Sequence, residues 1–557
     1  MKFYYYLFIV TVSLFYTTES QAQPSSVKNV AKSVFTLTTY KPDGTLLATS
    51  HGVFLNQNGE AISTLKPFIG AAKAVVTDTK GQQLQVTRLA GTNELYDVAR
   101  FHVDGKTTPA PLASIPLKAG DQAWIVGYAD KKPLVKAAPV KNVETFNESY
   151  HYYVFDIDTP EGFSSCPLVN DKGEVLALVQ NNATSFGIHA TDAHYPISLT
   201  LNGLSYTNAV IRQISIPLLM PTELQQAQLA LLMASQSSDS IKYAAAISDF
   251  KTLFPTEPDA YEAQARNEAR YGHYAEAESI MNDAINKVKN KDEAHYHFGR
   301  IIYDKILSQP TTDYPQWTLD KAFEEIEKAY AINPSPLYKH LQGQVLFSQT
   351  QYQPAYDIFM SLYNDSSYAS PQLLYQAARC KQMLKAPIEE TMALLDSAIN
   401  TTDTLQFRST APYFLTRAEI YMQADSFRQA TLDYTRYEYL MQGNVNDDFY
   451  YLRYQAEIKA NMFQQALSDI SRCVLLQPEE PLYYAEMAQL QLRVNMFELA
   501  AQSAERCTRI APEYAGGYLL LGLAQVKLGE KEKGLANMQK AKELGSDQAD
   551  AIIEKYK

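Results

Sequence analysis

Cysteine is scarce in this sequence. Only four cysteines occur in 557 residues. Cysteine metal sites and disulfide-rich domains space their cysteines closely and regularly, whereas these four are scattered. The sequence therefore predicts no metal ligand set, no disulfide framework and no cofactor. We interpret Cys473 and Cys507, which lie at equivalent positions of a repeat described below, as buried core thiols. The other two cysteines are Cys166 and Cys380.

Positive charge and long apolar runs are also in short supply. The formal net charge is −12, and nucleic acids and anionic membranes both need basic patches on a partner. We therefore expect no nucleic acid partner. Beyond the N-terminus no stretch is long and apolar enough to span a bilayer, so no integral membrane segment is expected. The length predicts two to four domains.

The N-terminal residues 1–22 have the pattern of a secretory signal peptide. Lys2 supplies the positive region, residues 3–16 form a short apolar run, and Ser20-Gln21-Ala22 offers small residues for cleavage. The alternative is an N-terminal membrane anchor, which the short run disfavours. No cysteine follows the run, so a lipoprotein anchor is not indicated. We expect an exported, soluble mature protein.

Residues 28–205 are rich in short strand patterns separated by turn signals. Val34–Thr39 alternates in a β-forming pattern, and Pro42-Asp43-Gly44 marks a turn. Gly52–Leu55 and Asp97–Val103 continue the series. Many short strands without a helical period predict an all-β barrel or sandwich.

A turn near the end of this region resembles a known nucleophile motif. Gly162-Phe163-Ser164-Ser165-Cys166-Pro167-Leu168-Val169 is similar to the Gly-x-Ser-Gly-Gly-Pro-Leu turn of trypsin-like serine proteases, most closely of the HtrA type. Segments 50–54, 59–68, 97–101 and 173–178 match other family segments in the same order. The resemblance implies two six-stranded antiparallel barrels with a site in the cleft between them, and a bacterial periplasmic, cell-surface or secreted location.

In this alignment the catalytic positions are only partly filled. Ser164 falls on the nucleophile and Asp97 on the triad aspartate, and the backbone N–H groups of Gly162 and Ser164 fall on the oxyanion hole. Lys66 stands at the histidine position. A lysine, with an unperturbed pKa of about 10.4, stays protonated beside a carboxylate and cannot accept the serine proton near neutral pH. Ser165 and Cys166 replace two family glycines. The resemblance therefore implies a degenerate, inactive site.

Several residues could restore activity, and each has a plainer interpretation. A strongly desolvated Lys66 could act as the base of a Ser–Lys dyad, although Asp97 opposes this. His51, or less readily His102, could replace the missing base, but isolated histidines are usually structural or exposed. Cys166 is two residues past the serine and is best interpreted as a small buried thiol. His189 and His194 lie near the family's specificity pocket and could line a peptide groove.

From residue 223 to 557, after a connector at 206–222, the sequence repeats with a period near 34 residues. A small residue is followed four positions later by a large or apolar one and seven positions later by a further core residue, at nine places. Pro258, Pro334, Pro478 and Pro512 lie in register, and an insert at 309–317 explains the one long spacing. The pattern resembles about nine tetratricopeptide repeats, which implies an all-α superhelix that binds peptides or proteins. The nine anchors are Ala246, Ala277, Ala322, Ala355, Thr391, Ala430, Ala466, Ala500 and Gly534.

The fold class expected is therefore an all-β double barrel followed by an all-α repeat superhelix. We interpret the protein as an exported adaptor in which a pseudoprotease domain is joined to a protein-interaction array. The alternative is an active HtrA-type serine endopeptidase that uses Ser164 and recruits substrates through its repeats. A third interpretation is a structural scaffold in an envelope assembly, in which the barrels only offer a docking surface.

Overall fold

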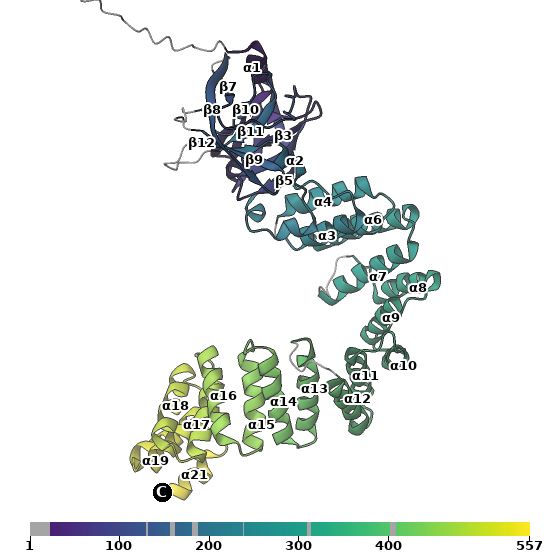
Figure 1. Ribbon diagram of the computed structural model, residues 1–557. Coiled ribbons are helices and arrows are strands. Elements are labelled where there is room, and N and C mark those ends of the chain that lie inside the picture. Colours follow the sequence, from purple (N-terminus) through teal and green to yellow (C-terminus); the bar gives the residue numbers. More distant parts are fainter. Residues whose placement is uncertain are drawn as a thin grey trace, which may run out of the picture. The chain divides into compact units, whose positions relative to one another are not determined.

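The computed structural model describes residues 23–129, 132–155, 157, 162–180, 188–237, 239–308, 314–401 and 408–557. The predicted signal peptide lies outside these residues, as do residues 309–313 of the predicted insert. The chain forms two compact units, the first ending at Ile301 and the second running from Ile302 to Lys557. The barrels belong to the first unit, and most of the helices belong to the second (Figure 1).

The first barrel closes six antiparallel strands in the order β1-β2-β3-β6-β5-β4. Alternate side chains of β1, such as Phe35 and Leu37, are fully buried, as a period of two requires. Gly52 lies at a crowded point of the sheet, because a Cβ there would come within 2.4 Å of both the Ile62 carbonyl oxygen and the Phe35 ring. The strands are β1 (Val34–Tyr40), β2 (Leu46–Phe54), β3 (Glu60–Ser63), β4 (Lys73–Thr77), β5 (Gln83–Asn93) and β6 (Val98–Val103).

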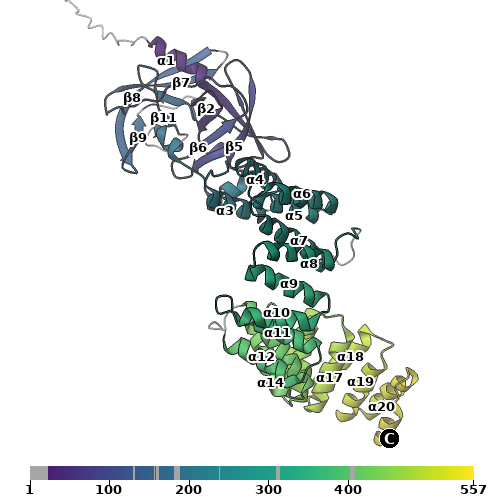
Figure 2. The same ribbon diagram turned by 90° about the vertical axis from the view of Figure 1, so that its right-hand side faces the viewer.

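The second barrel closes in the order β10-β11-β12-β9-β8-β7. The short helix α1 (Ser25–Val30) packs on it through Val27 and Val30, which share a core with Trp124 (Figure 2). The two closed six-stranded barrels confirm the predicted double barrel. The strands are β7 (Gln122–Ala129), β8 (Lys132–Phe146), β9 (Tyr150–Phe155), β10 (Pro167–Val169), β11 (Val175–Val179) and β12 (Ile188–Asp192).

The core of the first barrel continues into the helices that follow it. Ile214, Ile216 and Leu218 are buried in the same cluster as Phe101 of β6 and Phe250 of helix α4 (Ser240–Leu253). The segment also pairs with β5, because Leu89 N–H donates to the Pro217 carbonyl and the Leu219 N–H donates to the Leu89 carbonyl. The residues between barrels and helices are therefore part of a continuous core in the first unit.

The remainder of the described chain is a long run of helices, consistent with a repeat array and with the predicted all-α superhelix. Short 3-10 turns are η1 (Ala31–Ser33), η2 (Lys66–Phe68), η3 (Gly203–Thr207), η4 (Ile211–Gln213) and η5 (Arg408–Thr410). Besides α1 and α4, whose bounds are given above, the helices are α2 (His194–Ser198), α3 (Leu224–Ser235), α5 (Asp259–Arg270), α6 (Tyr274–Lys287), α7 (Lys291–Ser308), α8 (Leu319–Ile332), α9 (Pro336–Ser348), α10 (Tyr352–Tyr363), α11 (Pro371–Met383), α12 (Ile388–Asn400), α13 (Ala411–Gln423), α14 (Phe427–Leu440), α15 (Asp447–Lys459), α16 (Phe463–Leu476), α17 (Pro481–Arg493), α18 (Phe497–Ile510), α19 (Ala515–Lys527), α20 (Lys531–Glu543) and α21 (Ala549–Tyr556).

The nine predicted anchor residues fall on alternate helices, from α4 to α20, and all are buried. The residues four positions later, such as Phe250, Met281 and Ile326, are fully buried as well. Two third-position residues differ, since Leu253 is 43% exposed at the end of α4 and Tyr437 on α14 is only partly buried. The small anchors let neighbouring helices approach closely, which is what a stacked helical array requires.

In most pairs the first helix is followed, two residues after its end, by a residue with left-handed backbone. These residues have φ between +53° and +89°. In each case the next N–H donates to the carbonyl five residues earlier, as Gln351 does to Leu346, which is the Schellman arrangement. The turn residues are Gly272, Thr350, Lys385, Asp425, Asn461, Asn495 and Gly529.

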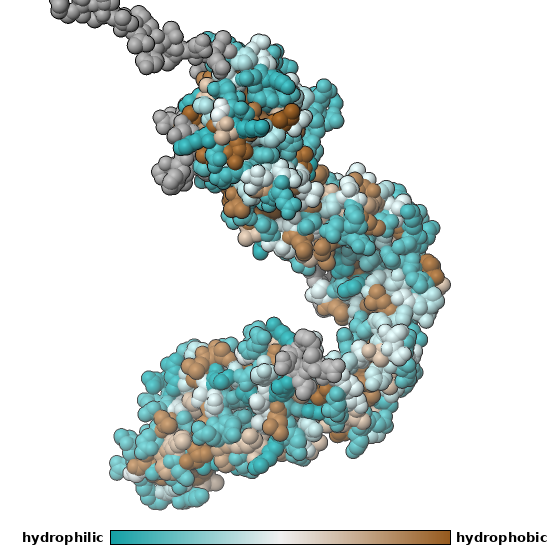
Figure 3. Space-filling view, viewed as in Figure 1, coloured by the Kyte–Doolittle hydropathy of each residue, from teal (hydrophilic) through white to brown (hydrophobic). Residues whose placement is uncertain are grey.

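Apolar groups on the face seen in Figure 3 are spread in small clusters among polar residues. Within the part of the chain that the structure describes, no helix combines the length and the apolar character that a membrane span needs.

Candidate functional site

Asp97 holds the loop that carries Lys66. It lies in the turn between β5 and β6 with φ of 46°, and its side chain is 9% exposed. Its Oδ1 accepts hydrogen bonds from the backbone N–H groups of Leu65 at 3.0 Å and Lys66 at 2.9 Å. The carboxylate therefore fixes the start of η2, directly after β3.

The Lys66 side chain returns to the same carboxylate. Its Nζ lies 3.7 Å from Asp97 Oδ2, while the lysine side chain is 63% exposed. The Lys66 amine is thus exposed to solvent and paired with Asp97, so at this position the side chain is the salt-bridge partner of that carboxylate.

Ser164 and Ser165 form a tight turn between β9 and β10. The Cys166 N–H donates to the Phe163 carbonyl at 3.2 Å, so the two serines occupy the central positions. Ser165 has φ of 63°, a left-handed value that the third residue of a type II turn needs and that glycine adopts most easily. Ser164 is half-buried, whereas Ser165 has no exposed surface.

The Ser165 hydroxyl belongs to a buried cluster of three hydroxyl groups. Its Oγ lies 2.6 Å from Ser50 Oγ on β2 and 2.5 Å from Thr64 Oγ1 after β3. This cluster joins the turn that carries Ser164 to the loop that carries Lys66. Ser50 and Thr64 were not predicted as site residues, and the only signal in the sequence was their position in segments that resemble the protease family.

Gly162 and Cys166 flank the turn on either side. Gly162 has φ of +97° and open space around its missing Cβ, so the conformation and not crowding calls for glycine. Cys166 is fully buried, and burial raises the pKa of its thiol far above the ordinary value. The thiolate needed for nucleophilic chemistry is therefore not accessible to Cys166.

His51 contacts the serine turn from β2. Its Nδ1 lies 3.2 Å from the Ser164 carbonyl oxygen, which can only accept, so Nδ1 carries the proton in that bond. Burial lowers the pKa of His51. In the neutral ring Nε2 is then the basic nitrogen. Of the candidate histidines, His51 is the one with a hydrogen bond to the turn of Ser164 and Ser165 among the described residues.

The other candidate histidines lie on other parts of the barrels. His102 is in β6 opposite Glu60, and burial lowers its pKa. His189 in β12 lies against the Tyr152 ring, with 5.2 Å between ring centroids. His194 places Nδ1 3.0 Å from Asp192 Oδ1 at the start of α2. None of these contacts involves Ser164.

The arrangement thus brings Asp97, Lys66 and the serine turn together through Thr64 and Ser165. It provides a carboxylate, an ammonium and a half-buried hydroxyl. A metal cluster is not part of it, because no group of three or more histidine, cysteine, aspartate or glutamate side chains among the described residues is arranged to hold an ion.

Comparison with known proteins finds a family match for the barrel region, which carries the residues just described. The family described as trypsin-like peptidase domain matches residues 36–178. A protease from M. tuberculosis, solved in its active form, shares 18% identity over 32% of this chain and 85% of its own, with a TM-score of 0.27. A serine endoprotease from Yersinia pestis shares 19% identity over 31% of this chain and 62% of its own, with a TM-score of 0.27. No curated protein matches the sequence.

The family match begins in β1 and ends in β11, so it contains the segments that carry Lys66, Asp97 and Ser164. Its strands belong to both closed barrels. Residues 36–178 therefore form a trypsin-like peptidase domain, and the chain continues from it into a long run of helices.

Proposed function

We propose that this protein is an exported adaptor that binds polypeptides, in which the trypsin-like domain has lost peptidase activity and the helices form a tetratricopeptide array. In this proposal the barrels span residues 28–205 and the array spans residues 223–557. Export rests on the signal-peptide pattern of residues 1–22, which would direct the protein to the periplasm or cell surface.

The observation that carries the proposal is the Lys66–Asp97 ion pair at 3.7 Å. The triad mechanism needs a base that takes the serine proton and later gives it to the leaving amine. In this proposal an exposed lysine that pairs with Asp97 stands in the place of that base and does neither. The side chains of Ser165 and Cys166, where the family has glycines, further support a turn that no longer serves catalysis.

The test is labelling of the purified protein by a fluorophosphonate probe, which reacts only with an activated serine. We expect no labelling of the wild type beyond that of Ser164→Ala, with a cooperative thermal transition showing that both proteins are folded. Labelling that is present in the wild type and lost in Ser164→Ala would overturn the proposal.

A second function, an active serine endopeptidase, is favoured by one specific observation. His51 donates from Nδ1 to the Ser164 carbonyl, which leaves Nε2 as the basic nitrogen next to the nucleophile turn. If the probe labels Ser164, His51→Ala and Lys66→Ala separate the two possible bases. Loss of labelling in His51→Ala alone would assign the base to His51, and the helices would then recruit substrates.

A further inference from the structure

One position recurs on the first helices of the second unit, six residues before the left-handed turn residue. From α9 to α17 it is occupied by Gln344, Arg379, Glu419, Gln455 and Gln489. Because the same turn follows each helix, these side chains project from equivalent faces of successive first helices. We call these five residues the groove row. It carries one cation, Arg379.

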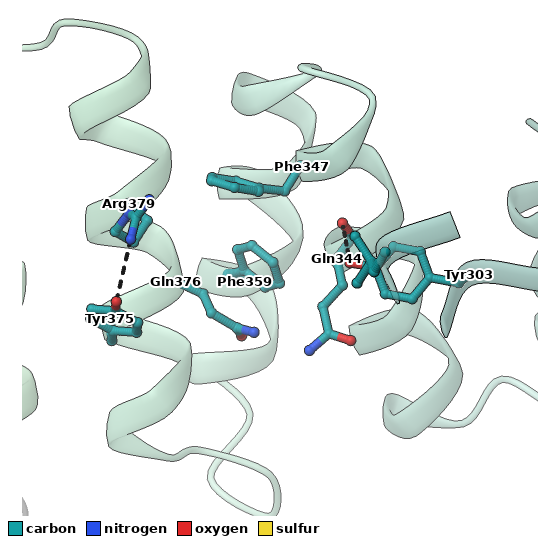
Figure 4. Close-up of a pocket in the computed structure, with 8 residues that line it drawn as sticks. Tyr303, Gln344, Phe347, Phe359, Tyr375, Gln376 and Arg379 are labelled. Atoms are coloured by element: carbon teal, nitrogen blue, oxygen red, sulfur yellow. Dashed lines mark hydrogen bonds between the residues drawn. The ribbon is translucent and has the colours of Figure 1, made fainter. Parts of the chain in front are cut away.

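Gln344 and Arg379 line a pocket of about 390 Å³ between α7, α9, α10 and α11 (Figure 4). Its walls are mostly apolar, and Leu307, which also lines it, is 56% exposed. The pocket has room for one large apolar side chain together with a small polar group. The remaining lining residues are Tyr303, Phe347, Phe359, Tyr375 and Gln376.

Arg379 lacks the carboxylate that neighbouring arginines have. Arg417 on α13 bonds Asp433 through two nitrogens at 2.7 and 2.8 Å, and Arg453 on α15 bonds Asp469 in the same way at 2.6 and 3.0 Å. Among the described residues, no carboxylate lies within ion-pair distance of Arg379. The guanidinium of Arg379 is therefore charged but unmatched.

The hydrogen bonds of Arg379 are also incomplete. Its Nη1 reaches only the Tyr375 hydroxyl, at 3.5 Å, and its buried Nε has no hydrogen-bond partner in the described part of the chain (Figure 4). The charge of Arg379 opposes the rise in the pKa of Glu419 that burial causes, but the two groups form no ion pair. A buried donor of a charged group that lacks a partner is costly, so an incoming carboxylate would gain from bonding it.

Gln376 adds a second donor to the pocket. His340 places Nδ1 3.3 Å from the Tyr368 hydroxyl and Nε2 2.7 Å from Gln376 Oε1. Because an amide oxygen accepts, His340 donates from Nε2, which leaves the Gln376 NH₂ group to donate elsewhere. The amide groups of Gln376 and Gln344 point toward one another across the pocket in Figure 4.

We propose that this pocket binds an extended polypeptide at a bulky apolar residue that is followed or preceded by aspartate or glutamate. The apolar side chain lies among Tyr303, Phe347 and Phe359, and the acidic side chain bonds Arg379. The two amides, on successive first helices, suit a backbone that continues through the pocket in both directions, which favours an acidic side chain over a chain terminus. The inference rests on the proposed role of the helices as a polypeptide-binding array.

The experiment selects nine-residue peptides, acetylated and amidated so that they lack terminal charges, from a random library on the full-length protein. We expect the wild type to enrich aromatic or aliphatic residues beside aspartate or glutamate. Arg379→Gln should lose the acidic preference while keeping the apolar one, and Arg379→Glu should favour lysine or arginine. Arg428→Gln, at an exposed arginine on α14, is the matched control and should select as the wild type does.

A double-mutant cycle on the best peptide makes the test quantitative. Arg379→Gln should weaken binding at least tenfold, replacement of the peptide's acidic residue by its amide should do the same, and the two changes together should cost little more. Equal selection by the wild type and Arg379→Gln, or additive losses, would overturn this inference while leaving polypeptide binding intact. Failure to select any peptide on folded protein would count against this pocket and against the proposed function together.

Discussion

At the residue scale, the Ser165 hydroxyl has a structural role in the turn. The left-handed backbone of Ser165 is strained for a residue with a side chain, at a cost of roughly 1–2 kcal/mol. The hydroxyl offsets this cost by bonding Ser50 and Thr64 inside the protein. The Ser165 side chain thus holds the turn to β2 and to the segment that follows β3, both in the other barrel.

We therefore predict different costs for the two adjacent serines. Ser165→Ala removes the shared partner of two buried hydroxyls and should lower the free energy of unfolding by about 1–3 kcal/mol. Ser164→Ala, at a half-buried position, should change it by less than about 0.5 kcal/mol. Denaturant titration of both variants measures the difference, and equal effects would rule out a structural role for the hydroxyl cluster.

Glu457 on α15 is a buried carboxyl in an acidic setting. It is 3% exposed, and its Oε2 has no hydrogen-bond partner within the described residues. Burial, helped by the charges of Asp469 and Glu438 and opposed by Arg453, raises its pKa to about 8. The folded state therefore holds a proton that the unfolded chain releases above an ordinary glutamate pKa of about 4.3.

The sign of the resulting pH dependence follows from this difference in bound protons. Stability contributed by protonated Glu457 is present at low pH and is lost as the pH rises from about 4.3 to about 8. Glu457→Gln, which mimics the protonated form, should match the wild type near pH 4 and exceed its stability by on the order of 5 kcal/mol at pH 8.5. Thermal melts across this range test it, with the exposed Glu479→Gln as control. A constant offset at all pH values would contradict the assignment.

The sequence predicted part of the site at this scale. Lys66, Asp97 and Ser164 could be proposed as site residues because each belongs to a short segment with a recognisable order, and their roles stay predictions. The bonds of Ser165 to Ser50 and Thr64 could not, because they join residues 115 and 101 positions apart and depend on how two barrels meet. The sequence also could not predict that Arg379 has no carboxylate partner among the described residues, because this depends on which side chains the fold brings near it.

At the scale of the element, the same left-handed turn recurs after the first helix of most pairs and leads into the second helix. Asparagine and glycine tolerate the left-handed backbone there, but Thr350 is β-branched and is poorly suited to its φ of 63°. Periodicity of small and apolar residues predicted the helices because burial of the anchors requires it. The same periodicity did not reveal this turn, which is filled by glycine in only two of seven cases.

Thr350→Gly should therefore stabilise the second unit. Relief of the left-handed strain, roughly 1–2 kcal/mol, exceeds the entropic cost of glycine, roughly 0.5–1 kcal/mol. We expect a net gain of about 1 kcal/mol in the free energy of unfolding, measured by denaturant titration. Thr350→Ala keeps the strain and should give no gain, and Asn461→Gly should gain less than Thr350→Gly. A loss of stability in Thr350→Gly would show that the threonine side chain is itself needed.

At the scale of the whole molecule, the peptidase domain does not end where its strands end. Arg88 on β5 bonds Asp249 on α4 through two nitrogens, at 2.6 and 2.8 Å, and the buried Lys242 donates to the Ile211 carbonyl. Apolar residues at 211–218 fill the space between barrel and helices. Helices α3 and α4 therefore pack against the first barrel and help to stabilise it within the first unit.

Asp249→Ala should weaken the barrels although it lies in a helix. Removing the carboxylate leaves a partly buried guanidinium without its partner, and we expect a loss of about 1–3 kcal/mol. The protein has two tryptophans, so a Trp317→Phe background leaves Trp124 of β7 as the only tryptophan reporter. Its fluorescence in a denaturant titration should show the loss. Asp283→Ala, which removes an exposed ion pair on α6, should leave the midpoint unchanged, and equal midpoints for both variants would refute the coupling.

The four cysteines also determine how the protein can be handled in solution. All are unpaired and buried, and burial raises the pKa of each thiol. They are therefore poor targets for maleimide dyes and spin labels as long as the protein stays folded. A single cysteine introduced on the surface, for example beside the groove row, would take up the label selectively, so binding could be followed spectroscopically without first removing any native thiol.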